Sequence, residues 1–437
     1  MAQPGQGKSD TRLNGCAESR ARLLTRSRYI TPMLRVLTLS SLFPDATRPN
    51  FGVFVERQTL GLAARADVVL TVVAPVGLPP FPLDRRGRHA RLARLPLVED
   101  WKGVTVYRPR FGAWPLTAGR WHAAALAHAV TPVLDRLAAG EGFDVIDASF
   151  FFPDGVAAVD LGRRYGVPVS IKARGADIHH WGAAPATAHQ VRAAGQAADG
   201  MLAVSAAMRD DMIDLGLPGD RIRVHYTGVD RQRFVRGDRA AQKAALGIAG
   251  PMVLSLGALI PRKGHDIVLG AVAMLPGVTL VVAGTGPDRA TLAALAVRLG
   301  VADRVRFLGD VAHAALPAII GAADVMALAS ASEGLANAWV EALACGTPIV
   351  VTDAGGAREV VRSPHVGRVA LRDTIAFAAA IADLLADPPS SDAVQAGAER
   401  FTWEANRDSL FDHLAALVAD YSANRVERGD DPAPLAA

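Results

Sequence analysis

The feature that most limits the fold of this chain is a regular alternation of short apolar runs with longer amphipathic segments. The apolar runs predict strands at Arg35–Ser40, Val68–Ala74, Val104–Arg108, Val145–Ser149, Val169–Lys172, Met201–Ser205, Ile222–Tyr226, Met252–Leu256, Thr279–Ala283, Val305–Leu308, Val325–Ala329, Ile349–Thr352 and Gly367–Ala370. Helices are expected between them, for example at Val53–Ala64, Ala118–Ala139 and Pro153–Tyr165. Strands that alternate with helices are typical of parallel sheets, so the sequence predicts an α/β fold.

A polar break at Gly228–Gly237 divides the strands into two series, which predicts two domains. We expect an N-terminal domain over residues 33–235, a C-terminal domain over 236–400 and a final helix over 401–421. Residues 1–32 and 422–437 are expected to be disordered tails. No apolar run is long enough for a membrane span, and residues 1–32 lack the apolar core of a signal peptide.

Two carboxylates stand eight positions apart, at Glu333 and Glu341, inside an otherwise apolar segment. Glu333 follows the strand Val325–Ala329 through the loop Ser330–Gly334, and Glu341 lies in the helix expected at Asn337–Ala344. Open α/β sheets bind ligands at the carboxyl ends of their strands, and helix N-termini attract anions such as phosphate. Carboxylates beside an anion site suit neutral sugar hydroxyls. A solvated Glu341 and a helix-capping Glu333 are the alternative.

The run from Glu333 to Val350, E-G-L-x-N-x-x-x-E-A-L-A-C-G-T-P-I-V, resembles the donor site of retaining GT-B glycosyltransferases of family 4, also called group 1. The resemblance extends from roughly Leu34 to Tyr421. It implies two Rossmann-like domains that face each other across a cleft, with a C-terminal helix that crosses back to the N-terminal domain. It also implies that Glu333 contacts the donor sugar and Glu341 holds the ribose. The backbone would meet the sugar and diphosphate at Gly334, Leu335, Ala336 and Asn337.

A second segment offers positive charge for the diphosphate leaving group. A strand ends at Gly257, and Arg262 and Lys263 stand just before the next helix, whereas no Asp-x-Asp triplet for a metal occurs in the chain. Fixed cations and helix amides can stabilise a leaving diphosphate without metal, so no cofactor is expected. We expect Arg262, Lys263 and Glu333 to be catalytic and Gly257 to bind donor. Ala258 replaces the arginine that many relatives carry, and a basic turn exposed to water is the alternative.

Other glycine turns lie near the expected cleft. Gly52, at the start of a helix, would let backbone amides approach the diphosphate from the N-terminal domain, although helix capping alone also favours glycine there. The turn Ala283–Pro287 lacks the third glycine of a dinucleotide site. The turn Asp353–Glu359 resembles the family's G-G-x-x-E loop, which implies a part in shaping the donor pocket.

The acceptor side of the cleft is expected at Asp147, Ser149, Arg174 and Asp177, which follow two strands of the N-terminal domain. Many relatives carry histidines where Asp147 and Ser149 stand, so no histidine base is expected at that point. Retention by front-side attack tolerates this, because a donor phosphate oxygen can accept the acceptor's proton. A surface ion pair is the alternative for Arg174 and Asp177.

The charge distribution limits the partners. The net charge is +4, and an arginine run from Arg85 to Arg94 is interleaved with Leu83, Leu92 and Leu95. Such a run suits anionic lipid, and a solvated face is the alternative. No nucleic-acid-binding module accompanies the charge. Cys16 and Cys345 are the only cysteines, which fits a reducing cytoplasm.

We therefore expect a cytoplasmic, metal-independent, retaining glycosyltransferase, with a position at the cytoplasmic face of a membrane as an open alternative. Its donor would be a nucleotide-sugar, with UDP favoured over GDP, and its acceptor a glycan or a lipid-linked glycan in polysaccharide or cell-surface synthesis. A nucleotide-sugar epimerase, a sugar phosphorylase and a catalytically silent nucleotide-binding subunit are the alternatives. A nucleotide-cofactor oxidoreductase is disfavoured, because the glycine motif is incomplete.

Overall fold

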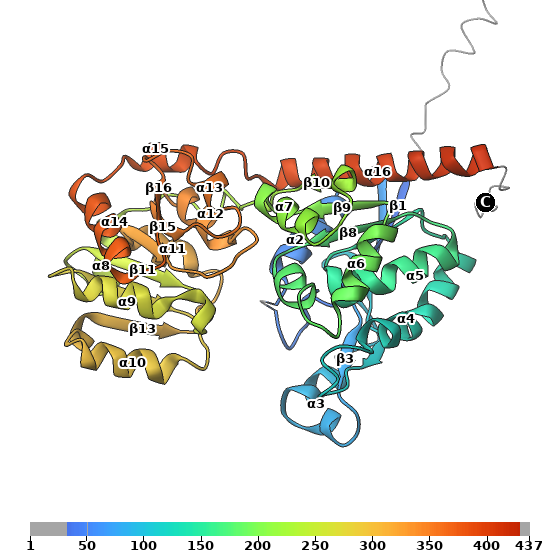
Figure 1. Ribbon diagram of the computed structural model, residues 1–437, viewed down its shortest axis with the longest axis horizontal. Coiled ribbons are helices and arrows are strands. Elements are labelled where there is room, and N and C mark those ends of the chain that lie inside the picture. Colours follow the sequence, from blue (N-terminus) through green and yellow to red (C-terminus); the bar gives the residue numbers. More distant parts are fainter. Residues whose placement is uncertain (1–32, 50, 429–437) are drawn as a thin grey trace, which may run out of the picture.

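The computed structural model describes residues 33–49 and 51–428, which form two α/β domains side by side (Figure 1). The strands of the N-terminal sheet are β1 (Leu34–Leu39), β2 (Val68–Val73), β4 (Val98–Trp101), β5 (Val104–Tyr107), β7 (Val145–Ala148), β8 (Val169–Ala173), β9 (Gly200–Ala203) and β10 (Ile222–Val224). Those of the C-terminal sheet are β11 (Met252–Leu256), β12 (Thr279–Ala283), β13 (Val305–Gly309), β14 (Val325–Leu328), β15 (Ile349–Thr352) and β16 (Gly367–Ala370). Their orders are β10-β9-β8-β7-β1-β2-β5-β4 and β13-β12-β11-β14-β15-β16.

Helices cover both sheets (Figure 1). They are α2 (Val53–Ala63), α3 (Gly87–Ala93), α4 (His122–Ala139), α5 (Val156–Tyr165), α6 (Ala188–Ala197), α7 (Ala206–Asp214), α8 (Arg239–Ala245), α9 (His265–Ala273), α10 (Arg289–Arg298), α11 (Leu316–Ala322), α12 (Asn337–Ala344), α13 (Ala357–Val360), α14 (Thr374–Ala386), α15 (Ser391–Ala396) and α16 (Trp403–Arg428). Short helical turns are η1 (Leu83–Arg85), η2 (Phe151–Gly155), η3 (Asp177–Trp181), η4 (Gly219–Arg221), η5 (Pro261–Lys263) and η6 (Ala302–Arg304). Helix α4 shows why they dock, because Ala123, Leu126, Val130 and Val133 recur at helical spacing and are buried.

The apolar runs form the expected strands, and all strand pairs of the C-terminal sheet are parallel. The bounds of β11, β12, β15 and β16 are the predicted ones, and the other predicted strands differ by one or two residues at their ends. Strands buried on both faces need apolar side chains at nearly every position, which is why this pattern is readable.

The N-terminal sheet departs from the parallel expectation at one edge, where β4 pairs antiparallel with β5. Lys102 and Gly103 form the turn between these strands with φ angles of 55° and 86°. Two successive positive φ angles are typical of a tight hairpin turn. A separate two-stranded sheet, β3 (Val76–Leu78) with β6 (Arg110–Gly112), and helix α3 were also not predicted.

Two predicted helix starts were wrong. Helix α4 begins at His122 instead of Ala118, since Leu116, Ala118 and Gly119 have positive φ angles that a right-handed helix does not accept. Helix α5 begins at Val156 instead of Pro153, because residues Phe151–Gly155 form the separate turn η2, in which Phe152 has an extended backbone.

The final helix returns to the N-terminal domain. Val229 bridges Thr402, so the two chain segments that connect the domains run side by side, and α16 then packs on α2, β7 and β8 (Figure 1). Helix α16 runs to Arg428, so the tail expected from residue 422 is helical to that point. Residues 429–437, and the tail expected over 1–32 with Cys16, lie outside the described residues.

Candidate active site

The first part of the site is a carboxylate with two cations at the carboxyl edge of the C-terminal sheet. Glu333 follows β14, and its Oε1 lies 2.5 Å from the Nζ of Lys263, at the end of η5. Arg262 donates to the carbonyl of Ser332 at 2.6 Å and lies 3.8 Å from Glu333 Oε2. The side chains of Glu333 and Lys263 are only 10% and 16% exposed, whereas that of Arg262 is 44% exposed, so the alternative of a basic turn in water is wrong for Lys263 but not for Arg262. The structure thus joins residues 70 positions apart in the sequence.

The start of α12 adds backbone amides beside this pair. Ala336 is the N-cap residue, and its side chain cannot accept a hydrogen bond from the first helical amides. Unpaired amides at a helix start make an anion site. Gly334 is needed for close contact between the domains, because a Cβ there would lie 2.6 Å from the carbonyl oxygen of Arg174. Leu335 and Asn337 lie in the same turn.

Glycines let the two loops that follow β11 and β12 meet beside Lys263. Gly257 has a φ angle of 147°, and a Cβ on Gly284 would lie 1.8 Å from the Gly257 carbonyl oxygen. A Cβ on Gly286 would lie 2.2 Å from the carbonyl oxygen of Leu259. These turns are therefore glycine-rich because backbones pass close to one another.

Glu341 is buried. It is 5% exposed in α12, and its Oε1 lies 3.2 Å from the Nε2 of His313, in the loop between β13 and α11. The alternative of a solvated Glu341 is therefore wrong. The alternative of Glu333 as a helix cap is also wrong, because Ala336 is the N-cap residue of α12 and no side chain caps that helix. His313 was not singled out from the sequence, because its loop carries no motif that would mark it.

Gly52 begins α2 with a φ angle of 70°, and a Cβ there would lie 1.4 Å from the carbonyl oxygen of Leu42. Only glycine fits this position, whatever binds at the helix start. The helix has no side-chain cap, so its first amides lack a side-chain partner.

The four residues expected on the acceptor side lie together at the end of β7 and β8, but mostly below the surface. Asp147 is 1% exposed, its Oδ1 finds no partner among the described residues, and burial raises its pKa to about 6. Ser149 accepts from Arg174 Nε through its carbonyl oxygen at 2.7 Å, and burial lowers the pKa of Arg174 to about 10. Asp147 and Ser149 are therefore poor candidates for direct contact with an acceptor.

Asp177 is fully buried and accepts backbone N–H groups of Phe151, Arg174 and Gly175 at 2.8–3.1 Å. It therefore fixes the loops that follow β7 and β8 instead of pairing with the Arg174 side chain. The alternative of a surface ion pair was wrong, because Asp177 is fully buried and the Arg174 guanidinium donates to the carbonyl of Ser149 and to Gln58 instead.

A buried polar layer lies next to these residues, between the N-terminal sheet and helices α2 and α16. Lys172 donates to Gln58 at 2.8 Å and contacts His225 Nδ1 at 2.5 Å, and burial lowers its pKa well below the usual range. His413 of α16 lies 3.0 Å from Ser170 Oγ. Ser170 and Lys172 stand at alternate positions of β8, which is the sign of this layer in the sequence.

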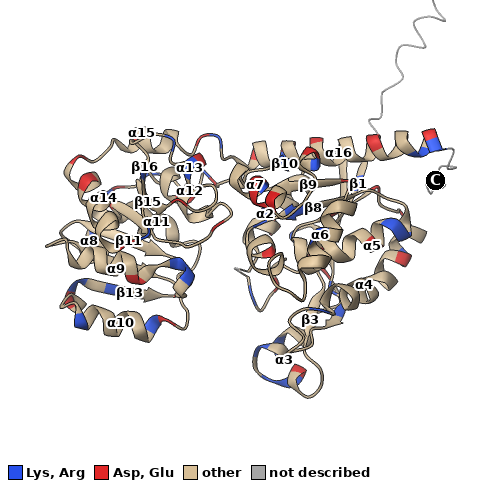
Figure 2. Ribbon diagram, in the orientation of Figure 1, with Lys and Arg blue, Asp and Glu red and all other residues tan. Residues whose placement is uncertain are grey.

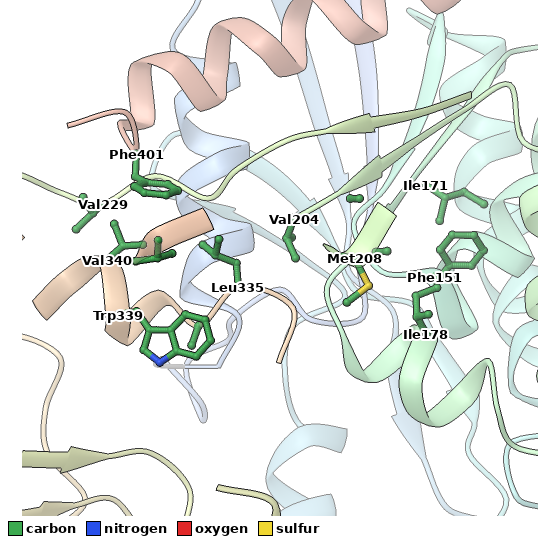
Figure 3. Close-up of a cluster of buried hydrophobic side chains, with 14 of the residues drawn as sticks. Phe151, Ile171, Ile178, Val204, Met208, Val229, Leu335, Trp339, Val340 and Phe401 are labelled. Carbon is green, nitrogen blue, oxygen red and sulfur yellow. The ribbon is translucent and has the colours of Figure 1, made fainter. Parts of the chain in front are cut away.

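The domains meet along the loops that carry Glu333 and the G-G-x-x-E turn. Ser205 donates to the carbonyl of Gly334 at 3.0 Å, and the Glu359 carboxylate accepts the N–H groups of Ala206 and Ala207 and the Tyr226 hydroxyl. Apolar side chains continue this contact from Val204 to Leu335 and Trp339 (Figure 3).

Comparison with known proteins assigns the chain to a family. A sequence model described as Glycosyltransferase Family 4 matches residues 52–233, and one described as Glycosyl transferases group 1 matches residues 238–401, so the two cover both domains in order. The chain belongs to the group 1 glycosyltransferases of family 4. The predicted family is thereby confirmed.

Curated relatives of this glycosyltransferase include the D-inositol 3-phosphate glycosyltransferases of Mycobacterium bovis and Mycobacterium tuberculosis. They are 38% identical over 226 residues, which are 48% of this chain and 47% of theirs. The chain thus spans about half the length of the curated relatives it matches.

Solved structures confirm the GT-B fold. Sucrose-phosphate synthase from Thermosynechococcus elongatus aligns with a TM-score of 0.74 at 21% identity, over 89% of this chain and 100% of that one. HepE from Anabaena, solved in complex with UDP-glucose, aligns with a TM-score of 0.67 at 21% identity, over 88% and 100%.

Two further observations concern metal and membrane. Over residues 33–49 and 51–428, no three or more His, Cys, Asp or Glu side chains gather as metal ligands would. None of the helices in this same part of the chain has the length and apolar character to cross a bilayer.

Proposed function

We propose that this glycosyltransferase moves a sugar from a UDP-sugar to a glycan or lipid-linked acceptor in polysaccharide or cell-surface glycan synthesis, with retention of configuration and without metal. The observation that carries the proposal is the Glu333–Lys263 pair at 2.5 Å beside the start of α12. The UDP-glucose complex of HepE and the names of the mycobacterial relatives support a nucleotide-sugar donor.

In this proposal each residue has a distinct task. Glu333 accepts hydrogen bonds from the donor sugar, and Glu341 accepts them from the ribose hydroxyls. Lys263, Arg262 and the α12 amides stabilise the negative charge that grows on the diphosphate as the sugar's C1–O bond breaks. The acceptor oxygen bonds to C1 on the same face, and a donor phosphate oxygen takes its proton. Asp147 is too deeply buried to act as base.

Calorimetry with UDP and with UDP-sugars on three variants tests this division of tasks. Glu341→Ala should weaken UDP binding roughly tenfold to hundredfold, since a charge-assisted contact is worth about 1.5–3 kcal/mol. Glu333→Ala should leave UDP binding intact but weaken UDP-sugar binding. In an assay of sugar transfer, Lys263→Ala should lower kcat more than it lowers the affinity for donor. Nucleotide binding and sugar transfer by the wild type should both persist in excess EDTA.

The proposal fails if neither glutamate variant changes nucleotide binding, and the division of tasks fails if both weaken UDP equally. Activity that disappears in EDTA and returns with magnesium or manganese would refute metal independence. Product analysis separates the alternatives, because an epimerase converts UDP-sugar without acceptor and a phosphorylase releases sugar phosphate in phosphate buffer.

We also propose a cytoplasmic location with contact to anionic membrane lipid through the segment around α3. Arg85, Arg86, Arg88, Arg91 and Arg94 are all exposed there. Figure 2 shows the Lys and Arg positions along this segment in blue. Phe81 and Leu97 on the same segment are 70% and 64% exposed, which suits an interface that is both charged and apolar. Leu92 and Leu95, by contrast, are buried in a small core and do not face outward.

Sedimentation with vesicles tests the membrane contact. Changing the five arginines to serine should reduce binding to vesicles that contain anionic phosphatidylglycerol, and binding should fall with salt. Equal binding of the variant, or no binding by the wild type, would leave the segment as a solvated face.

A further inference from the structure

The contact between Glu341 and His313 lies at a junction of both domains and the segment that links them. We propose that His313 is a positioning residue, which orients the Glu341 carboxylate for the ribose of the nucleotide and makes this orientation depend on contact with the N-terminal domain. This inference rests on the proposed role of Glu341.

Only one of the two carboxylate oxygens of Glu341 contacts His313. Oε1 lies 3.2 Å from His313 Nε2, and no residue that the structure describes donates to Oε2. A carboxylate only accepts hydrogen bonds, so Nε2 must carry the proton in this contact. The two side chains are 17% and 6% exposed, so little water competes with the bond.

The imidazole ring is itself held by two phenylalanines from other parts of the fold. Phe54 of α2 packs edge-on with ring centroids 6.4 Å apart and an angle of 81° between the ring planes. Phe234 of the interdomain segment packs similarly, at 5.4 Å and 72°. Edge-to-face packing fixes a ring's plane as well as its position.

A chain of contacts therefore extends from Phe54 in the N-terminal domain through the His313 ring to the Glu341 carboxylate in the C-terminal domain. Separation of the domains would remove Phe54 from His313, and the ring would gain freedom to turn away from Glu341. Glu341 would then lose the donor that fixes one of its oxygens. A carboxylate that must be ordered on binding holds its ligand less tightly than one ordered in advance.

Calorimetry with UDP tests the role of His313 separately from that of Glu341. His313→Leu should keep the packing against the phenylalanines but weaken UDP binding, by roughly three- to tenfold for one lost hydrogen bond. His313→Gln should restore most of the affinity, since its amide nitrogen reaches to about the same place as Nε2. His365→Leu, at an exposed histidine of the same domain, is the matched control and should bind UDP normally.

The outcomes separate the two proposals. If Glu341→Ala does not weaken UDP binding, the proposed ribose site itself fails. If Glu341→Ala weakens binding but His313→Leu leaves it unchanged or tightens it, only the role of His313 is overturned. Should His313→Leu fail to fold, His313→Gln against His313→Asn decides, because the shorter amide cannot reach Glu341. Equal affinity of these two variants would refute the proposal.

Discussion

The charged residues at and near the expected site divide into those at the edge of the C-terminal sheet and those buried within the N-terminal domain. Lys263 and Glu333 pair at the edge of the C-terminal sheet, whereas Lys172 and Asp147 are buried in the N-terminal domain, with pKa values that burial shifts in opposite directions. Burial disfavours whichever form is charged, so acids become weaker and bases lose their protons more readily. Stability should consequently depend on pH through the buried layer.

His413 offers the cleanest test of that dependence. Burial lowers its pKa to about 4, from an ordinary value of about 6.5, so the unfolded chain binds a proton that the folded protein does not. His413 should therefore cost stability increasingly as the pH falls from about 6.5 to 4, by up to about 3 kcal/mol. The expected result is that His413→Gln is less sensitive to acid than the wild type in urea unfolding.

The difference between wild type and variant is the quantity to measure. Asp154, whose pKa burial raises to about 7, contributes the opposite slope, because the folded state then binds the extra proton, but it cancels in the difference. His365→Gln, at an exposed site, should show no such change. A difference for His413→Gln that stays constant with pH would contradict the prediction.

At the scale of elements, the turns matter more than the strands they join. Strands β11 and β12 follow from apolar composition, but their ends meet only because Gly257 and Gly284 bring two backbones together. The loop that precedes Lys263 depends on this contact. A change at Gly284 should thus affect both the stability of the fold and the positions of Arg262 and Lys263.

Gly284→Ala should destabilise the protein by about 2–4 kcal/mol, since the added Cβ meets a carbonyl oxygen that cannot move freely. Gly277→Ala is the matched control, because Gly277 also has a positive φ angle, of 75°, but its Cβ would meet open space. That change should cost only about 1 kcal/mol of backbone strain. Equal losses of unfolding free energy in urea would show that the close approach is relieved elsewhere.

At the scale of the whole molecule, the two domains are held together by Glu359 and the loop that carries Glu333, as well as by the crossing helix. Glu359 of α13 accepts the first N–H groups of α7 at 2.9 and 3.1 Å and the Tyr226 hydroxyl at 2.7 Å. A carboxylate at a helix N-terminus is favoured by the helix dipole. Any opening of the domains must break these contacts.

Glu359→Ala should therefore shift the molecule toward a more open arrangement. Distances between spin labels on α10 and α4 should broaden and lengthen, while Tyr226→Phe, which removes one of the three hydrogen bonds, should show a smaller effect. Unchanged distances in Glu359→Ala would mean that the apolar contact between Val204 and Leu335 suffices to hold the domains.

The sequence alone determined the α/β fold, most strand positions and the segments that carry Glu333, Glu341 and Lys263, because buried strands and the donor-site motif depend on local patterns. Tertiary structure decided which side chains meet. His313 faces Glu341, Glu359 caps a helix of the other domain, and the residues expected at the acceptor surface are mostly buried beneath it. Such contacts join positions far apart in the chain, and no local periodicity records them. The burial of these side chains and the contacts they make are therefore set only when the chain folds and the two domains pack.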